Sequence, residues 1–421
     1  MEGRTIVVGG GVMGTAIAWA AARRSDPIEA PVVLFEKGQL AAGSSGRSGA
    51  ILRQFYSDRA LVDMARDSLR VYASLQAATG RHIGYQRMGV LTIGGPAAPD
   101  TIGLVRRNAE LLRTSGIDAR VLDASAMRAL VPGLVVDDAA IGCHEPDGAG
   151  VDPVRTVEAF ASLAREAGAI TRIGERVLGI EISGGRVRGV RTDTATVECE
   201  RLVVATGPWS GPLLASIGVQ IPLQVVRPEQ HFVELPSGSI PRGSDRDDLL
   251  ADSVLDRFGI AAKRMPSPAH PVILDIEKGF YTRCESHALR TRVGRMDHSQ
   301  DAPVHDPDTI EESVSTAFQR WARTVLESRL PAYREERDAG SLVGLYTLTP
   351  DAQAAIGPWP AIPNLYVVTG FSGHGFKLAP SVAEGIAQML DDEPVTAFDP
   401  TFFAPERFRA PTQPHGRPFG L

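Results

Sequence analysis

The residues near the N-terminus that are spaced for chemistry are three glycines and a glutamate. Gly9, Gly11 and Gly14 form a G-x-G-x-x-G pattern between an apolar, β-branched run and an alanine-rich helical pattern. Such glycines permit a tight turn, a close approach of the backbone to a pyrophosphate, and close packing of helix on strand. Glu36 ends the next apolar run, where a carboxylate can accept hydrogen bonds from a ribose diol. The pattern predicts a dinucleotide-binding turn; the alternative is a glycine-rich turn that binds nothing.

A lysine stands out in the stretch FSGHGFKLAPSVAEG, residues 371–385. Lys377 lies at the expected start of a helix, where the first backbone N–H groups lack partners and the helix dipole is positive, so that anions are favoured. A lysine is locally unfavourable at such a place. Lys377 therefore either points into water or waits for a negatively charged group.

The kind of dinucleotide follows from Glu36 and from two later segments. A carboxylate at Glu36 would repel the 2′-phosphate of NADP. The glycine pattern does not choose between NAD and FAD, but a Gly/Ser loop over 41–50 and a strand with a small-residue turn over 202–210 can wrap a long ligand, which favours FAD. The residues expected to hold FAD are Gly9, Gly11, Val12, Met13, Gly14, Glu36, Lys37, Ser44, Ser45, Arg47, Ser48, Gly49, Val177, Ala205, Thr206, Gly207, Trp209, Gly373, His374, Gly375, Phe376 and Lys377.

The elements that must position these residues follow from the pattern of apolar residues. The run from RTIVV to VVLFEK indicates a strand–helix–strand unit and a parallel sheet. Asp152 and Pro153 suit the start of a helix, and the alternation over 176–207 indicates a β-meander that turns at Gly184 and Gly185. Further helices are expected over 57–79, 100–116, 309–329 and 379–390, a strand pair over 280–294, loop or lid material over 236–271, and a loosely held tail over 408–421.

Composition argues against several classes of partner. The chain has 421 residues and a formal net charge of −6, which disfavours nucleic acid or an anionic membrane as its main partner. Cys143, Cys199 and Cys284 lie far apart without a C-x-x-C motif, so no metal site is expected. We find no apolar stretch of the roughly 18 residues that would cross a bilayer, and no signal-peptide pattern. The sequence predicts a cytoplasmic protein.

Five motifs carry a family resemblance: VVGGGVMG…LFEK, GSSGRSGAILRQFYS, VVATGPWS, GLYTLTPDAQAAIG and GFSGHGFKLAPSVAEGIA. Together they resemble the amine-oxidising flavoproteins of the D-amino-acid oxidase superfamily, in particular the sarcosine oxidase branch (monomeric enzymes and β subunits). The resemblance implies an α/β fold with a Rossmann-like FAD-binding domain built on a parallel sheet, and an α+β substrate domain with a mixed, largely antiparallel sheet. The FAD-binding domain is expected from residues 1–80, 145–215 and 340–395, the substrate domain from 81–144 and 216–339, and a C-terminal tail from 396–421.

The resemblance also implies the residues that contact substrate. The lysine of sarcosine oxidases that matches Lys377 pairs with the substrate carboxylate, and the arginine that matches Arg53 makes the second contact. An arginine can hold a carboxylate bidentately and a lysine acts as a point charge. For Arg53 the alternative is a structural salt bridge. Tyr346 and Tyr281 match active-site tyrosines and could equally be packed aromatic residues.

Three positions depart from the family pattern. Gly344 stands where monomeric sarcosine oxidases carry the cysteine that binds the flavin covalently, and Arg47 stands where dimethylglycine dehydrogenases carry a histidine, so we expect non-covalent FAD. Arg292 replaces a lysine that helps oxygen react; it keeps the charge but is bulkier, so oxidase and dehydrogenase both remain open, with a slight preference for oxidase. The neighbouring polar residues His144, Glu145 and Asp147 are expected to be loop structure.

The implied activity is oxidation of the C–N bond of a small amino acid that carries a carboxylate: a secondary, N-methylated or cyclic amine. Hydride would pass to flavin, and the imine product would hydrolyse. The electron acceptor would be molecular oxygen or another acceptor. Three alternatives remain: an FAD-dependent 2-hydroxyacid dehydrogenase, a flavin subunit that acts only with a partner in a larger assembly, and a binding protein without catalysis.

Overall fold

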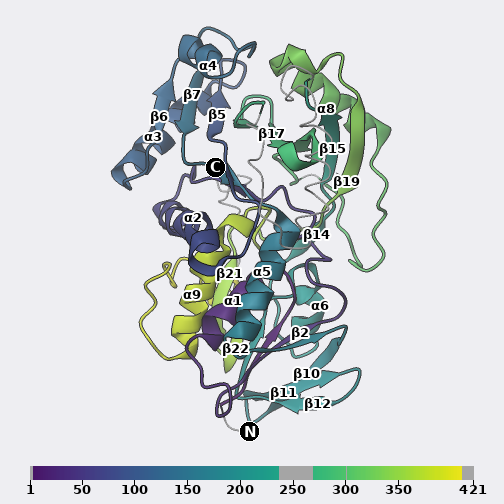
Figure 1. Cartoon of the computed structure of the whole chain (residues 1–421). Coiled ribbons are helices and arrows are strands. Elements are labelled where there is room, and N and C mark those ends of the chain that lie inside the picture. Colours follow the sequence, from purple (N-terminus) through teal and green to yellow (C-terminus); the bar gives the residue numbers. More distant parts are fainter. Residues whose placement is uncertain (1–2, 237–268, 300, 410–421) are drawn as a thin grey trace.

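A computed structural model describes residues 3–236, 269–299 and 301–409, and two sheets organise them (Figure 1). The first sheet has six strands in the order β21-β22-β13-β1-β2-β9. Its strands are parallel except for the antiparallel edge strand β21. The bounds are Thr5–Val8 for β1, Val32–Glu36 for β2, Ile170–Ile173 for β9, Arg201–Val204 for β13, Ala355–Trp359 for β21 and Ile362–Thr369 for β22.

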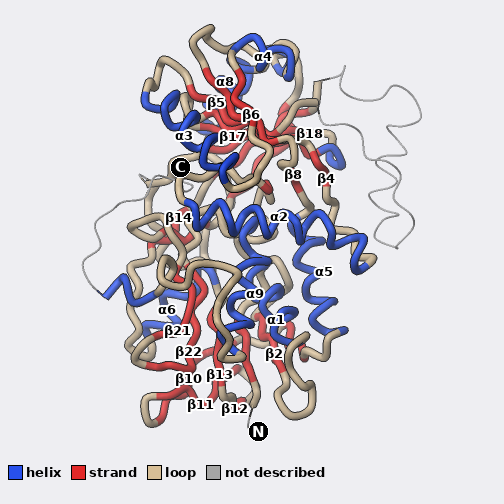
Figure 2. The backbone as a smooth tube through the Cα atoms, turned by 90° about the vertical axis from the view of Figure 1, so that its left-hand side faces the viewer, coloured by secondary structure: helices blue, strands red, loops and turns tan. Residues whose placement is uncertain are grey.

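Helices cover one face of this sheet and a small meander covers the other (Figures 1 and 2). Helix α1 (Val12–Ala22) is apolar on nearly every side and is buried between the sheet and helices α5 (Pro153–Glu166) and α9 (Ala379–Leu390). Helix α2 (Arg59–Thr79) packs on α9. The meander consists of β10 (Val177–Ser183), β11 (Arg186–Thr192) and β12 (Thr196–Glu198), and it turns at Gly184 and Gly185 as predicted.

The second sheet has eight strands in the order β19-β15-β18-β17-β16-β5-β7-β6, and only its β16–β5 pair is parallel. Helices α8 (Thr316–Arg329) and α4 (Ala124–Leu130) share an apolar core with it, and α3 (Asp100–Thr114) packs on β5 and β7. The strands are β5 (Val90–Gly94), β6 (Arg120–Leu122), β7 (Ile141–Glu145), β15 (Glu229–Glu234), β16 (Val272–Asp275), β17 (Phe280–Glu285), β18 (Arg290–Arg295) and β19 (Asp338–Val343).

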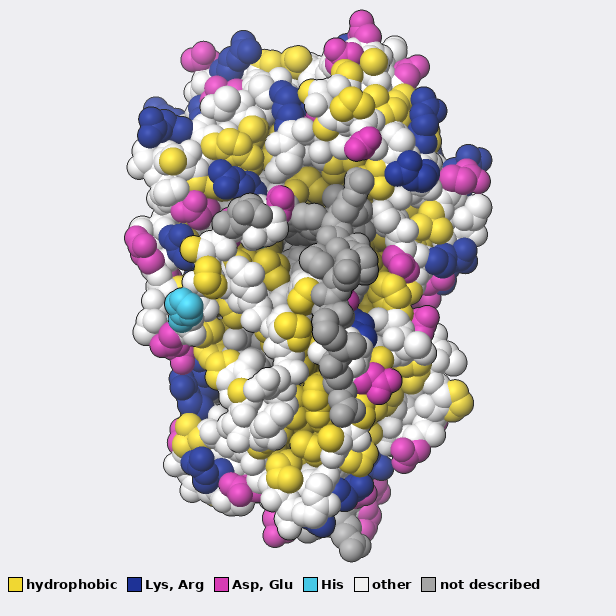
Figure 3. All heavy atoms as spheres, turned by 180° about the vertical axis from the view of Figure 1, so that it is seen from behind, with side chains coloured by type: hydrophobic (Ala, Val, Ile, Leu, Met, Phe, Trp, Pro, Cys, Tyr) yellow, Lys and Arg dark blue, Asp and Glu magenta, His cyan; other side chains and the backbone are white. Residues whose placement is uncertain are grey.

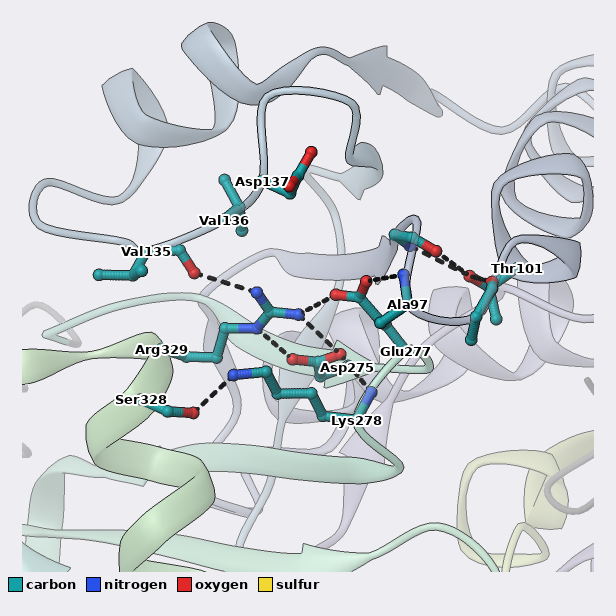
Figure 4. A network of polar contacts seen from close by, with 12 residues as sticks. Ala97, Thr101, Val135, Val136, Asp137, Asp275, Glu277, Lys278, Ser328 and Arg329 are labelled. Carbon is teal, nitrogen blue, oxygen red and sulfur yellow. Dashed lines mark hydrogen bonds and ion pairs between the residues drawn. The ribbon is translucent and has the colours of Figure 1, made fainter.

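A buried ion network fastens the end of α8 to the second sheet (Figure 4). Arg329 donates from Nε to Asp275 Oδ2 at 2.5 Å and from Nη1 to the Val135 carbonyl at 3.1 Å. Arg329 also pairs with Glu277, whose Oε1 accepts from the Ala97 backbone N–H at 2.8 Å. Because buried charges are costly unless paired, the network fixes these segments relative to one another.

The α/β fold with a parallel and a mixed, largely antiparallel sheet confirms the predicted fold class. Helices predicted over 57–79, 100–116 and 379–390 are α2, α3 and α9. The helix predicted over 309–329 is wrong in its first part, because α8 begins at Thr316. Arg227 takes the backbone carbonyls of Glu311 and Ser313 as acceptors, and these carbonyls are then not engaged in helical bonds.

Two other expectations need correction. His144 and Glu145 belong to strand β7 and not to a loop, whereas Asp147 does lie in the following turn. The start of the tail expected to be loosely held over 408–421 is packed: Phe408 is buried in the apolar core that includes Ile6 and Leu365 of the six-stranded sheet. Residues 237–268 of the expected loop and 410–421 of the expected tail lie outside the described residues.

The strands of the six-stranded sheet come from segments assigned to the FAD-binding domain, while the division of the chain into domains stays a prediction. On the face seen in Figure 3, lysine and arginine side chains are interspersed with aspartate and glutamate. Among the described residues, no helix is both long and apolar enough to cross a membrane.

Candidate active site

A cleft of about 630 Å³ opens where the parallel strands of the first sheet end. Its walls are the turns that follow β1, β2, β13 and β22, together with the Gly/Ser loop. The carboxyl ends of parallel strands are the usual ligand site of doubly wound sheets, because the connecting turns and helix N-termini meet there. The fold therefore places the predicted dinucleotide turn at the cleft.

The turn after β1 is built from backbone that only glycine permits. Gly9 has φ = 117°, and a Cβ on Gly14 would lie 1.8 Å from the Gly9 carbonyl oxygen. Helix α1 starts behind Gly11 with no acidic residue in its first turn, so its positive end faces the cleft. The Ser45 hydroxyl accepts from the Val12 N–H at 2.9 Å and ties the Gly/Ser loop to this turn.

Glu36 is fixed by two backbone bonds at the edge of the cleft. Its Oε2 accepts from the Gly10 N–H at 2.7 Å and its Oε1 from the Gly38 N–H at 2.8 Å. These bonds hold the carboxylate beside the glycine turn, where it can accept from the hydroxyls of a ribose. The position agrees with the role predicted for Glu36.

Most of the residues expected to hold the cofactor line this cleft. Gly14 instead lies beneath the turn, Gly49 and Lys377 line an adjoining cavity, and His374 lines neither because its Nε2 bonds to the Ala352 carbonyl at 2.9 Å. The expected residues that line the cleft are Gly9, Gly11, Val12, Met13, Glu36, Lys37, Ser44, Ser45, Arg47, Ser48, Val177, Ala205, Thr206, Gly207, Trp209, Gly373, Gly375 and Phe376.

A segment between β18 and α8 also lines the cleft, which the sequence did not reveal: its lining residues are Pro307, Asp308, Ile310 and Glu312. Asp308 fastens this segment: it accepts from Trp209 Nε1 at 3.0 Å and from Arg176 Nη2 at 3.2 Å, and it pairs with Lys37. Lys37 in turn lies over the Trp209 ring. No local pattern in this segment indicates a cleft, and the sequence predicts a helix from residue 309.

Arg47 and Gly344, the two positions from which the sequence predicts non-covalent FAD, offer no nucleophile. Arg47 donates to the Val343 carbonyl at 3.0 Å and pairs with Glu312 at 2.6 Å. Gly344 has no side chain. Cys143, Cys199 and Cys284 are buried, and none of them lines the cleft in the described part of the chain.

A second, smaller cavity of about 50 Å³ adjoins the cleft. Ser48, Tyr346, Gly373 and Phe376 line both spaces, so the cavity opens directly onto the cofactor site. Its other walls are mostly apolar, with two cationic side chains among them: Gly49, Ala50, Ile51, Arg53, Leu274, Tyr281, Met296 and Lys377.

The cavity brings Arg53 and Lys377 together from opposite ends of the chain. Arg53 follows β3 (Ile51–Leu52), is 3% exposed, and holds its guanidinium 4.2 Å from the centre of the Tyr56 ring. Lys377 lies in a 3₁₀ turn before α9, is 7% exposed, and donates to the His374 carbonyl at 3.3 Å. Burial and the charge of Arg53 lower the pKa of Lys377 well below its usual value. Lys377 thus does not point into water.

Glu145 is a buried residue that the sequence analysis assigned to loop structure. It ends β7, is fully buried, and its Oε1 accepts from the Gln54 N–H at 2.5 Å. Burial raises the pKa of Glu145 to about 7, although the Gln54 N–H and the charges of Arg53 and Lys377 oppose the shift. Its neighbours in the sequence gave no signal, because its charged partners are distant along the chain.

The two predicted tyrosines face the cavity, and burial raises the pKa of both. Tyr346 begins β20 (Tyr346–Leu348) and meets the His298 ring edge-on at 5.2 Å between centroids. Arg292 lines neither space: its Nη2 pairs with Glu285 Oε1 at 2.6 Å. Burial alone would raise the pKa of Glu285, but Arg292 and its neighbouring arginines bring it to about 2.

The described residues contain no group of three or more His, Cys, Asp or Glu side chains that could hold a metal ion. The ligand chemistry of the site is therefore that of the glycine turn, the fixed carboxylate of Glu36, and the two buried cations.

Comparison with known proteins places the chain in a family. Residues 4–389 match the model of the "FAD dependent oxidoreductase" family. The 4-methylaminobutanoate oxidase of Paenarthrobacter nicotinovorans is 26% identical over 92% of this chain and 43% of its own length, and human peroxisomal sarcosine oxidase is 25% identical over 90% of each chain. L-proline dehydrogenase from P. horikoshii shares the fold, with a TM-score of 0.81 at 23% identity over 97% of this chain and 98% of its own. The cleft is lined by the glycine turn and by the Glu36 carboxylate, which are compatible with bound FAD, and the chain belongs to the FAD-dependent oxidoreductase family.

Proposed function

We propose that this protein oxidises the C–N bond of a small amino acid with one carboxylate, a secondary, N-methylated or cyclic amine. The observation that carries the proposal is the position of Arg53 and Lys377, buried in a cavity that opens onto the cofactor cleft. The names of the two curated relatives support the same substrate class, because both are oxidases of N-methylated amino acids. The chain spans less than half the length of the first of them.

Arg53 and Lys377 would hold the substrate carboxylate, the arginine through paired N–H groups and the lysine through its charge. Two cations beside the amine also disfavour its protonated form, and the amine must be neutral to give up a hydride from the adjacent carbon. Bound FAD supplies the hydride acceptor. The apolar walls, including Leu274 and Met296, keep water from the reacting carbon.

The cofactor would be held by the glycine turn, α1, Glu36 and the Gly/Ser loop. Because Arg47 and Gly344 carry no suitable nucleophile, we propose that FAD is bound without a covalent link. The segment at Asp308 would cover part of the bound cofactor.

Oxidation of a 2-hydroxy acid would use the same carboxylate clamp, but it requires a base to remove the hydroxyl proton. No histidine or carboxylate lines the small cavity among the described residues, which favours the amine. The test is anaerobic mixing of the FAD-loaded protein with N-methyl amino acids, cyclic imino acids, primary amino acids and 2-hydroxy acids. Loss of flavin absorbance with an amine supports the proposal, and loss only with hydroxy acids contradicts it.

The electron acceptor depends on positive charge near the flavin. Arg292 lines neither space, but its Nη1 donates to the carbonyl of Arg47, a residue of the cleft wall, at 3.2 Å. A positive charge near the flavin favours reaction with oxygen, and Arg53 and Lys377 add two cationic side chains in the adjoining cavity. We therefore propose molecular oxygen as the acceptor, in line with the slight preference for an oxidase. Admitting air to the reduced protein tests this: rapid reoxidation by oxygen is expected, and slow reoxidation by oxygen beside rapid reoxidation by a dye would contradict it.

A further inference from the structure

Glu145 is buried against the segment that carries Arg53, one of the two cations of the cavity. Strand β8 (Ala149–Gly150) pairs with β3, the strand that leads into Arg53, and Glu145 at the end of β7 accepts from the backbone of the next residue, Gln54. Glu145 itself does not line the cavity. It can therefore act on a bound substrate only through the residues that do.

The groups that face Glu145 are mainly cations and weak acids. The charges of Arg53 and Lys377 both act on Glu145, and the charge of Glu145 acts back on Lys377, raising its pKa against the effects of burial and Arg53. The nearby weak acids, Tyr56 and Cys143, have pKa values raised by burial to about 12 or beyond. Glu145 is the acidic group in this cluster that can be ionised near neutral pH.

Backbone N–H groups of the segment that carries Arg53 face Glu145. Oε1 accepts from the Gln54 N–H at 2.5 Å, and the Phe55 N–H also lowers the pKa of Glu145. Oε2 is buried and meets no hydrogen-bond partner among the described residues. Glu145 is thus held against the segment that carries Arg53, at the end of β7.

We propose that Glu145 is a positioning residue that supplies a counter-charge for the buried Arg53 and Lys377. Counted over these three described side chains, one carboxylate against two cations leaves one net positive charge, which suits a substrate with a single carboxylate. The inference rests on the proposed function of the same cavity. Without Glu145, two buried cations would repel each other, and Lys377 would lose its proton more readily.

The test measures how tightly propionate, a carboxylate without an oxidisable amine, perturbs the absorbance of the FAD-loaded protein as pH rises from about 6 to about 9. At the lower pH Glu145 is largely protonated, so Glu145→Gln and the wild type should bind alike. At the higher pH the variant should bind about tenfold more weakly, because Lys377 loses its proton more readily without the Glu145 charge, which raises the pKa of Lys377. Glu277→Gln, which changes a buried carboxylate in the remote network of Figure 4, should not alter the pH profile.

Adding Lys377→Arg to Glu145→Gln should remove the pH dependence, because an arginine keeps its charge. Equal or tighter binding by Glu145→Gln at high pH would overturn the inference. If that variant does not fold, the wild type decides: binding retained to about pH 9 supports a lysine held protonated, and loss below about pH 8 contradicts it. If propionate perturbs the wild type at no pH, the carboxylate site itself fails, and the inference fails with it.

Discussion

The cofactor cleft and the substrate cavity adjoin, but they are built from different parts of the chain. The cleft is formed by backbone: the Gly9 turn, the start of α1, and side chains such as Glu36 that are themselves fixed by backbone N–H groups. The cavity is formed by side chains, with Arg53 and Lys377 brought from distant positions to one buried place. Damage to the cleft should therefore come from adding atoms at glycines, and damage to the cavity from removing single charges.

The largest effect is expected from Gly14→Ala. Its Cβ would lie 1.8 Å from the Gly9 carbonyl oxygen. Because the contacted atom belongs to the backbone and not to a flexible side chain, the glycine turn should be displaced and FAD binding lost. The flavin absorbance per protein measures this, and circular dichroism confirms that the protein is folded. Gly211→Ala in α6 (Ser210–Ala215) is the matched control, because its Cβ meets nothing within 4 Å. Full FAD content in Gly14→Ala would contradict the claim that the cleft depends on glycine backbone at this turn.

Lys377→Met should leave the FAD content unchanged and lower kcat/KM by about thirtyfold or more. Removing one partner from a buried charged contact costs about 2–5 kcal/mol, and each 1.4 kcal/mol is tenfold. Steady-state kinetics measures the loss. Lys278→Met is the control, because Lys278 bonds to Ser328 far from both spaces. Kinetics unchanged by Lys377→Met would show that the lysine does not hold the carboxylate.

Asp308→Asn should weaken FAD binding only about threefold, because exposed ion pairs contribute less than about 1 kcal/mol. The Asp308 side chain is 37% exposed, and its pairs with Lys37 and Arg176 should be screened by salt. Fluorescence titration of the apoprotein with FAD at low and high salt measures both effects. Asp138→Asn changes an exposed carboxylate elsewhere and should do nothing. If added salt weakens FAD binding by Asp308→Asn as much as by the wild type, the ion pairs of Asp308 do not help to hold the cofactor.

The last prediction is that no flavin stays attached to the denatured chain. Precipitation in acid should release all FAD to the supernatant, since Arg47 and Gly344 cannot form a covalent link. The absorbance of the supernatant and of the washed pellet is compared. Yellow colour in the pellet would require another attachment residue.

The sequence predicted the cleft better than the cavity, and the reason is distance along the chain. The glycine turn is a contiguous motif whose meaning depends on backbone conformation. Lys377 stands out by its place at an expected helix start, and a family resemblance adds the expected contact with a carboxylate. Glu145 was assigned to a loop because its partners, Arg53 and Lys377, are remote in sequence. The same limit hid the pairing of Arg292 with Glu285.

The helix predicted over 309–329 failed for a related reason. Residues 309–315 have no feature that forbids a helix, but Arg227 from another part of the chain takes their carbonyls, and Ser315 caps α8 later than expected. Tertiary contacts of this kind override local propensity. They also bring Asp308 to the cleft, where no local pattern placed it.

The central claim is that a carboxylate held by Arg53 and Lys377 presents an amine to the flavin. The most direct measurement is the anaerobic rate of flavin reduction by an N-methyl amino acid and by its carboxamide, which lacks only the negative charge. The account predicts reduction by the acid and a rate at least about thirtyfold lower with the amide, the loss expected for a buried charge pair. Equal rates with acid and amide would contradict it.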